Sequence, residues 1–286
     1  MRLLLTLISK TPFATLYLVS DVFYLLNKYV IRYRYDVVRS NLRNAFSERS
    51  ESEIDALTEE TFRSLSDLLV ETIKGIGISR GELERRMGIT ASSRVHELVD
   101  QGQPLLFLTA HYCNWEWLLL YSCMHLSHPL MVAYQPFHNR RFDEFMLEAR
   151  TRFGGKAVPA TDLIRQIIKN RKTLKTLTLL ADQSPSRNER KYWTTFLNQD
   201  TAFIDATDSL AWLTRMPVIF VTTKRRKRGH YDVSLKVIAE PPYEKNSHNV
   251  VESYARELDA MIRADPPAWL WSHRRWKFSR PDDDCR

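Results

Sequence analysis

A histidine and a glutamate five residues apart, His111 and Glu116, are the side chains best suited to chemistry in this chain. They stand where a short apolar run, residues 104–110, gives way to a helical pattern, and α/β proteins often place their sites at such strand ends. His111 can act as a general base near neutral pH, and Glu116 can hold its imidazole in one tautomer. On a continuous helix this spacing would set the two about 140° apart, so their contact requires a turn between them. A loop histidine and a helix glutamate without a catalytic role are the alternative interpretation.

The motif around these two residues resembles a known enzyme signature. His-x-x-x-x-Asp/Glu after a buried strand is similar to the signature of lysophospholipid and glycerolipid acyltransferases. The form His-Tyr-Cys-Asn-Trp-Glu at residues 111–116 resembles more specifically the bacterial lipid A biosynthesis (lauroyl/myristoyl) acyltransferases. Further segments, in chain order, also resemble that family: residues 33–42, Tyr-Gln-Pro-Phe-His-Asn at 134–139, the basic helix end 148–154, Ala-Asp-Gln at 181–183, and Trp-Leu-Trp-Ser-His-Arg-Arg-Trp-Lys at 269–277.

The resemblance thus covers nearly the whole chain, with two departures. Tyr134 stands where many members of the family have Arg, and residues 188–191 replace the usual Gly-Arg-Lys-type loop. Both departures concern the head group of the acceptor more than the chemistry.

The resemblance implies a mechanism that these residues can carry out. His111 would take the proton from an acceptor hydroxyl as it attacks an acyl thioester, and Glu116 would orient His111 and stabilise the imidazolium. Positioned general-base catalysis of this kind contributes about 10²–10⁴-fold. Arg150, in the family-like helix end, would stabilise the oxyanion or grip the phosphopantetheine of the donor. An ordinary solvated arginine is the alternative for Arg150.

The other family-like segments supply candidates for binding substrate. Asn114 is one of them, although an N-cap of the following helix explains its type equally well. Cys113 lies in the motif, but the family does not require a cysteine there, and we interpret it as a small filler. The remaining substrate-binding candidates are Asn139, Asp182, Gln183, His273, Arg274 and Arg275.

The periodicity of the chain predicts an α/β fold. Short continuous apolar runs at 104–110, 130–134, 176–181, 218–222 and 231–238 are typical of buried strands. Helical patterns alternate with them at 115–125, 142–153, 162–170, 205–215 and 250–263. With the resemblance, this predicts a glycerolipid-acyltransferase-like mixed sheet flanked by helices over 101–286, preceded by a helical cap over 36–100.

The first 35 residues predict a membrane-anchoring helix. Apolar residues run through 13–26, but Lys10, Pro12 and Asp21 interrupt them, and a cluster of cations follows at 28–43. Cations beside an apolar, Tyr-rich helix are typical of an anchor whose body lies on the cytoplasmic side of the inner membrane. A buried core helix is the alternative, and the pattern leaves open whether the segment spans the membrane or lies on it.

The charge of the chain indicates an anionic partner. The 286 residues carry 42 Lys and Arg against 34 Asp and Glu, a net charge of +8. Basic clusters at 187–191, 224–228 and 274–277 suit an acyl carrier protein or anionic membrane lipids, with a solvated turn as the alternative for 224–228. The tryptophans near the C-terminus, Trp269, Trp271 and Trp276, suit a membrane interface. Three cysteines, Cys113, Cys123 and Cys285, fit a reducing compartment.

Other functional classes have weaker support. Cys123-x-His125-x-x-His128 has no second pair at a finger-like distance, so we expect no metal, and no cofactor other than the acyl-carrier donor itself. No helix-turn-helix, finger or aromatic RNA-binding pattern accompanies the charge, so nucleic acid is not an expected partner.

The combined prediction is an acyltransferase that moves a fatty acyl chain from an acyl-carrier-protein thioester to a hydroxyl of a lipid A precursor, in lipopolysaccharide biosynthesis. Acylation of another bacterial membrane lipid, such as an aminolipid, glycolipid or lysophospholipid, is the alternative within the same chemistry. A basic, peripheral membrane-binding protein is the non-enzymatic alternative.

Overall fold

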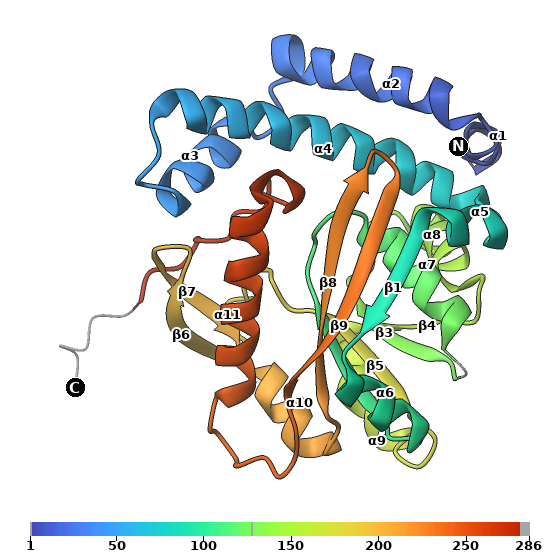
Figure 1. Ribbon diagram of the computed structural model, residues 1–286, viewed down its shortest axis with the longest axis vertical. Helices are drawn as coiled ribbons and strands as arrows, with labels where there is room; N and C mark the ends of the chain where they lie inside the picture. The colour runs from blue at the N-terminus through green and yellow to red at the C-terminus, as the bar shows by residue number, and fades with distance from the viewer. Residues whose placement is uncertain (1, 127, 281–286) are drawn as a thin grey trace.

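A seven-stranded mixed sheet forms the centre of the molecule (Figure 1). The computed structural model describes residues 2–126 and 128–280. Neighbouring strands run parallel except β8 and β9, which form an antiparallel hairpin, so the predicted mixed α/β sheet is confirmed. In spatial order the strands are β1 (Met87–Ala91), β9 (His230–Ala239), β8 (Val218–Lys227), β2 (Leu105–Thr109), β5 (Thr176–Leu180), β3 (Leu130–Tyr134) and β4 (Lys156–Pro159).

Helices flank this sheet at the positions that the periodicity predicts. They are α7 (Trp115–His125), α8 (Arg140–Thr151), α9 (Leu163–Lys169), α10 (Ala206–Thr214) and α11 (Asn249–Ala264). Right-handed crossovers from β2 to β3 and from β3 to β4 require α7 and α8 to lie on one face. The return connections through α9 and α10 then lie on the other face, where α10 also packs against α11.

Four strands lie outside the segments that the sequence predicted as strands. β1 falls within the predicted helical cap, after α5 (Arg80–Arg86) and before α6 (Ser93–Asp100), and pairs with β9. The cap therefore contributes an edge strand to the catalytic sheet, and a purely helical 36–100 segment is wrong at this point. β4 has only four residues, and β6 (Lys191–Phe196) and β7 (Gln199–Ile204) form a separate hairpin. The two-residue turn of that hairpin has positive φ at Leu197 and Asn198, without the glycine that usually announces such a turn.

The N-terminal region is a layer of helices built on one long helix. α4 (Glu51–Gly77) starts with a capping box, in which the Ser50 side chain accepts from the backbone of Glu53 and the Glu53 side chain accepts from the backbone of Ser50. α1 (Arg2–Ser9), α2 (Phe13–Leu26) and α3 (Tyr35–Ala45) pack against α4, and a π-helical turn (Asn27–Ile31) extends α2. Figure 1 shows α2 lying outside α4, on the side away from the sheet.

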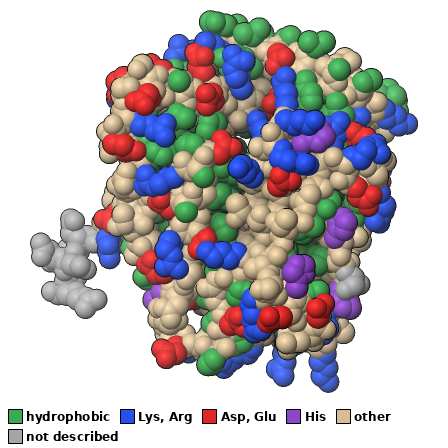
Figure 2. All heavy atoms as spheres, viewed as in Figure 1, with side chains coloured by type: hydrophobic (Ala, Val, Ile, Leu, Met, Phe, Trp, Pro, Cys, Tyr) green, Lys and Arg blue, Asp and Glu red, His purple; other side chains and the backbone are tan. Residues whose placement is uncertain are grey.

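The predicted single anchoring helix is divided in two. A bend of 118° separates α1 from the helix over Phe13–Ile31, at the interruption by Lys10 and Pro12. In the described residues no single helix is long and apolar enough to cross a membrane, while this bent pair together meets the length and composition that crossing requires. Leu16, Ser20 and Tyr24 are buried against the body, whereas most apolar side chains of the pair are exposed. Figure 2 shows these exposed apolar atoms gathered along the edge formed by α1 and α2.

The basic cluster at 224–228 has an internal role that the sequence did not indicate. It lies at the tip of the β8–β9 hairpin, where Gly229 has a φ of +69°. Arg228 lies 2.7 Å from Asp21 of α2 and 2.6 Å from Asp67 of α4, and Arg226 pairs with Asp232 at 3.0 Å. Carboxylates therefore neutralise Arg226 and Arg228, and the ion pairs of Arg228 tie α2 and α4 to the tip of the hairpin.

Candidate active site

His111 lies directly after β2 and pairs with Asp182, which follows the adjacent strand β5. The His111 Nδ1 atom lies 2.8 Å from Asp182 Oδ1, and Trp269 Nε1 donates to Asp182 Oδ2 at 2.9 Å. Burial alone would raise the pKa of Asp182, but the charge of His111 and the hydrogen bonds from His111 and Trp269 hold it below its ordinary value. An ionised Asp182 fixes the proton of His111 on Nδ1, which leaves Nε2 as the basic nitrogen.

The expected contact between Glu116 and His111 is replaced by two separate pairs. Glu116 accepts from Arg150 Nε at 2.9 Å and from Arg150 Nη2 at 2.5 Å, a bidentate geometry that fits a guanidinium to a carboxylate. The spacing within the motif explains the difference: the chain turns through Tyr112 and Cys113 and enters α7 at Trp115, so Glu116 faces α8 while His111 faces the end of β5. Glu116 therefore pairs with Arg150, and Asp182 pairs with His111. Because Asp182 is 2% exposed and both of its carboxylate oxygens have internal partners, its prediction as a substrate-binding residue is wrong.

The loop that carries His111 is held by the C-terminal segment. Cys113 adopts a φ of +51°, and its backbone N–H donates to Ala268 at 2.8 Å. The Leu270 N–H donates to the His111 carbonyl at 3.0 Å. Cys113 is buried and its pKa is raised to about 12 by desolvation, so it is a packing residue, as its small size indicated, and not a nucleophile.

The two asparagines among the candidates are helix caps. Asn114 is fully buried, accepts from Trp117 N at 2.9 Å at the start of α7, and donates to Glu71 Oε2 at 2.7 Å. Asn139 accepts from Phe142 N at 3.0 Å at the start of α8 and is not in the lining of the large cavity described below. The capping alternative is thus confirmed for Asn114, and its prediction as a substrate-binding residue is wrong. The position of Asn139 gives no support to a substrate-binding role.

Of the C-terminal candidates, His273 lies near the site, whereas Arg274 and Arg275 do not. His273 accepts from Ser184 N at 3.1 Å beside Gln183, and desolvation lowers the pKa of His273 to about 4. Arg275 is 2% exposed, lies over Phe203 at 4.5 Å and donates to Ala202 O, so it is a core residue and its prediction as substrate-binding is wrong. Arg274 is exposed and lies outside the cavity lining.

The tryptophans of the same segment are core residues as well. Trp269 and Trp271 are 3% and 0% exposed, and the half-buried Trp276 stacks on Trp271 with ring centroids 6.4 Å apart. Their expected place at a membrane interface is wrong because these rings fill the space between the β6–β7 hairpin and α3. The sequence pattern of aromatic and basic residues is common to both arrangements, so it could not separate them.

A cavity of about 1170 Å³ opens beside His111. This exceeds the roughly 300–1,000 Å³ of ordinary small-molecule pockets. The polar side chains around it include the His111, Glu116, Arg150, Gln183 and His273 that the sequence singled out, together with Lys277. Most of the remaining lining is aliphatic, so the cavity suits a molecule with a polar reacting centre and long apolar parts.

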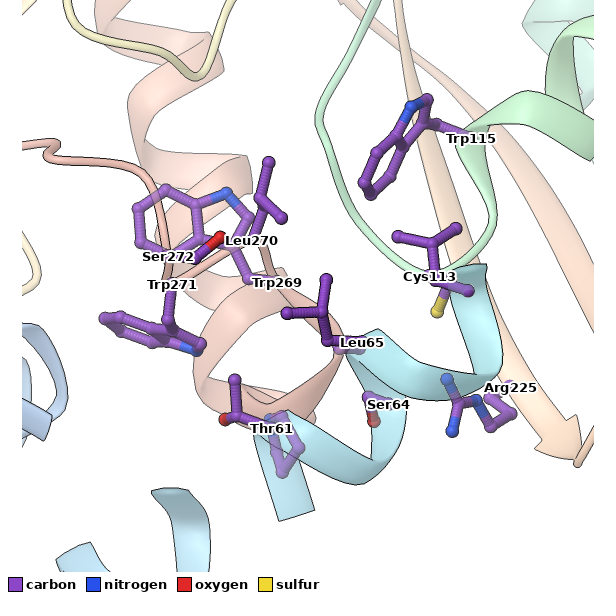
Figure 3. A pocket seen from close by; sticks show the side chains of 13 residues that line it. Thr61, Ser64, Leu65, Cys113, Trp115, Arg225, Trp269, Leu270, Trp271 and Ser272 are labelled. Carbon is purple, nitrogen blue, oxygen red and sulfur yellow. The ribbon is translucent and has the colours of Figure 1, made fainter. Parts of the chain in front are cut away.

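A second, water-sized cavity of about 20 Å³ lies behind the motif loop (Figure 3). Cys113, Trp115 and Leu65 of α4 line it, together with Arg225 of β8. The His111 ring contacts Trp115 edge-on, with centroids 5.1 Å apart. The side chains around this small gap support the loop from behind, and the gap has no room for substrate. Among the described residues, no group of three or more Cys, His, Asp or Glu could hold a metal ion.

Sequence reasoning missed the pairing of His111 with Asp182 and the contribution of β1 and α6 to the cavity. A signal for the pairing exists, since Asp182 follows a buried strand directly, as His111 does. Its use required the knowledge that these two strands are neighbours.

Comparisons with known proteins show the family of the chain. Residues 2–278 match the family described as bacterial lipid A biosynthesis acyltransferase. The chain is 24% identical over 252 residues to the lipid A biosynthesis palmitoleoyltransferase of Escherichia coli (strain K12), covering 88% of this chain and 81% of that protein. The identity and coverage are the same for the lipid A biosynthesis acyltransferase of Shigella flexneri. The corresponding Haemophilus influenzae protein is 21% identical over 86% of this chain and 78% of its own length. The chain is therefore an acyltransferase enzyme, and it belongs to the bacterial lipid A biosynthesis acyltransferase family.

Proposed function

We propose that this enzyme transfers a fatty acyl chain from the thioester of an acyl carrier protein to a hydroxyl of a lipid A precursor. The observation that carries the proposal is His111, held by the buried Asp182 at 2.8 Å on the wall of a large apolar cavity. A base held in this way is suited to deprotonating a hydroxyl, and the cavity is suited to fatty acyl chains. The names of the relatives support lipid A as the acceptor.

The proposed reaction proceeds through a tetrahedral intermediate. His111 Nε2 takes the proton of the acceptor hydroxyl while the hydroxyl oxygen attacks the thioester carbonyl. Asp182 stabilises the imidazolium that forms. When the intermediate collapses, the carbon–sulfur bond breaks, and the proton passes from His111 to the departing thiolate. The products are the new ester and the free thiol of the carrier protein, and no acyl-enzyme is formed.

Arg150 is the proposed stabiliser of the developing negative charge or of the donor's phosphate. Its guanidinium lines the cavity and its side chain is 18% exposed, so it is partly desolvated, which strengthens its interaction with an anion. The bidentate pair with Glu116 fixes the orientation of the guanidinium. Glu116 is thus a positioning residue in this proposal, in place of the histidine partner that the motif spacing suggested.

The test is acyl transfer by the full-length protein in detergent micelles. Acyl carrier protein loaded with a labelled acyl chain is incubated with lipid A precursor and one enzyme variant. The variants are the wild type, His111→Ala, and His128→Ala as a matched control in an exposed loop. We expect His111→Ala to lower kcat by about 10³-fold and His128→Ala to leave it unchanged. Equal transfer by His111→Ala and the wild type would contradict the mechanism. Transfer to an aminolipid, glycolipid or lysophospholipid, but not to the lipid A precursor, would replace the acceptor and keep the base.

The proposal includes a location on the inner membrane, with the catalytic body on its cytoplasmic side. The exposed apolar side chains of α1 and α2, such as Leu18 at 66% and Leu25 at 48%, support it. Deleting residues 1–31 would also remove the buried contacts of α2, so paired substitutions are a sharper test. We expect Leu18→Ser with Leu25→Ser to reduce sedimentation with anionic vesicles. Ile168→Ser with Leu213→Ser, which changes exposed residues of α9 and α10, is the control.

A further inference from the structure

The large cavity is bounded by one entire face of the sheet. Phe107 of β2 is paired with Thr178 of β5, which is paired with Val132 of β3, and Val132 is paired with Ala157 of β4. Paired residues on neighbouring strands point to the same side, and all four line the cavity. This row therefore covers the half of the face from β2 to the β4 edge.

The same face lines the cavity as far as the other edge of the sheet. Val221 of β8 is two residues from Ile219, which pairs with Phe107, so Val221 and Phe107 share a side. Val221 pairs with Leu235 of β9, and Leu235 pairs with Ala91 of β1. Val221, Leu235 and Ala91 also line the cavity. The lined face thus crosses six strand spacings, roughly 29 Å.

Helices α6 and α7 cover this face without filling it. Val95 and Val99 of α6 and Leu118 and Leu119 of α7 line the cavity. Ile89 of β1 and Val99, which line the cavity, remain 46% and 53% exposed. Apolar side chains with so few protein contacts are suited to packing against an apolar ligand. We name this space the α6–α7 compartment.

A second set of lining residues lies on the opposite face. Leu179 of β5 pairs with Leu108, which pairs with Phe220, and Phe220 packs on Tyr254 of α11. Leu179 therefore faces α11 and the neighbouring α10. The cavity lining includes Leu179 together with residues of α9 and α10, namely Leu163, Ile164, Ala206 and Leu210. We name this space the α9–α10 compartment.

The two compartments meet at the reacting centre. His111 follows β2 and Gln183 follows β5, at the shared carboxyl edge of two adjacent strands, and both residues line the cavity. The His111 Nε2 atom lies 3.4 Å from the Gln183 side-chain nitrogen. A ligand that passes over this edge moves from one face of the sheet to the other beside the proposed base.

We propose that the two compartments bind two different acyl chains, the donor chain between the sheet and α6–α7 and the acyl part of the acceptor between the sheet and α9–α10. The inference rests on the proposed function. The donor is assigned to the α6–α7 side because Arg150 and Glu116 belong to the helices α7 and α8 on that face, next to where a thioester carbonyl would lie. The length of that face suits an extended chain, and an acceptor chain on the opposite face would bring its hydroxyl to the same edge.

Matched alanine-to-leucine substitutions separate the compartments. Ala91→Leu narrows the α6–α7 compartment and Ala206→Leu narrows the α9–α10 compartment, while Ala56→Leu adds the same side chain on the exposed side of α4. Ala157→Leu serves as a second variant of the α6–α7 compartment. Transfer is measured for each folded variant with a medium-chain and a long-chain acyl carrier protein, and with acceptors whose hydroxyacyl chains differ in length.

We expect Ala91→Leu to lower the kcat/KM ratio of long to medium donor about tenfold and to leave the preference for acceptor length unchanged. Ala206→Leu should change the preference for acceptor chain length and leave the donor ratio unchanged. Ala56→Leu should change neither preference. If both compartment variants shift the donor ratio equally, or neither shifts any ratio, the division into two chains is wrong.

Thermal stabilisation by free medium- and long-chain fatty acids is measured in parallel. If Ala91→Leu is the one variant that long-chain fatty acid no longer stabilises, the donor compartment is supported, even if the wild type does not transfer acyl groups to lipid A precursor. Equal stabilisation of all variants contradicts it.

Discussion

Two buried carboxylates near the catalytic motif, Asp182 and Glu71, have opposite electrostatic surroundings. Both are almost fully buried, at 2% and 1% exposed. Asp182 accepts from His111, which can carry a positive charge, and the pKa of Asp182 is lowered. Glu71 accepts from three neutral donors, the Tyr17 and Tyr231 hydroxyls and the Asn114 amide, and burial raises the pKa of Glu71. At similar burial the balance therefore differs: the charge and hydrogen bonds of its partners outweigh burial at Asp182, whereas burial outweighs the partners at Glu71.

The two carboxylates accordingly have different roles. In the proposed mechanism Asp182 remains ionised beside a base that gains and loses a proton, so it would contribute to the reaction. Glu71 joins α2, β9 and the loop after His111 through uncharged hydrogen bonds, so it contributes to stability.

The largest effect is expected from Asp182→Asn. The asparagine amide group would donate to His111 Nδ1 and place the imidazole proton on Nε2, where it blocks base catalysis. We expect kcat to fall by about 10³–10⁴-fold, measured by acyl transfer at neutral pH. Glu71→Gln is the matched control, because it also replaces a buried carboxyl by an amide, and its kcat should stay within a few-fold of wild type. A similar loss of kcat in both variants would remove the distinction between the two carboxylates.

Glu71→Ala should act on stability instead. It leaves three buried donors without their acceptor, so we expect the free energy of unfolding to fall by about 3 kcal/mol. Glu71→Gln retains an acceptor and should lose about 1 kcal/mol. Urea unfolding of both variants measures the difference. If the two substitutions cost the same, the hydrogen bonds of Glu71 do not stabilise the fold.

A pH effect is expected from His273, the neighbour of Asp182. Because desolvation lowers its pKa to about 4 from 6.5, the unfolded chain binds its proton more readily than the folded chain between these values. Stability therefore falls as the pH falls through this window, by about 2 kcal/mol after allowance for partial exposure. His273→Gln should flatten this part of the profile relative to wild type. Glu71, whose pKa is raised, contributes with the opposite sign, so the difference between variant and wild type is the informative quantity. Parallel profiles for the two proteins would contradict the prediction.

The smallest effect should come from Glu116→Gln. It removes the charge that orients Arg150 while His111 and Asp182 keep their contact. We expect kcat/KM to fall about tenfold, with the pH dependence of kcat unchanged. Glu144→Gln, which removes the exposed partner of Arg140 on the same helix as Arg150, is the control. A fall as large as that of Asp182→Asn, with an altered pH profile, would return Glu116 to the role of partner of His111.

Much of the fold was readable from local patterns. Five strands and five helices of the sheet region follow from apolar periodicity, because a strand such as β2 is buried on both faces and therefore continuously apolar. The start of α4 follows from the capping residues Ser50 and Glu53. β4, β6 and β7 were missed because they are short or close without a glycine turn, and β1 was missed because it lies among helices.

The sequence by itself determined the alternation of strands and helices, the family resemblance, and the placement of His111, Glu116, Arg150 and Gln183 around one site. Tertiary structure alone decided which carboxylate serves which partner. Glu116 is five residues from His111 but enters a helix that turns it toward Arg150, whereas Asp182 is 71 residues away and adjacent because β2 and β5 pair. It also decided that Asn114 and Arg275 are internal, and that one cavity reaches both faces of the sheet. Strand order and packing set these outcomes, and neither is a property of a local stretch of chain.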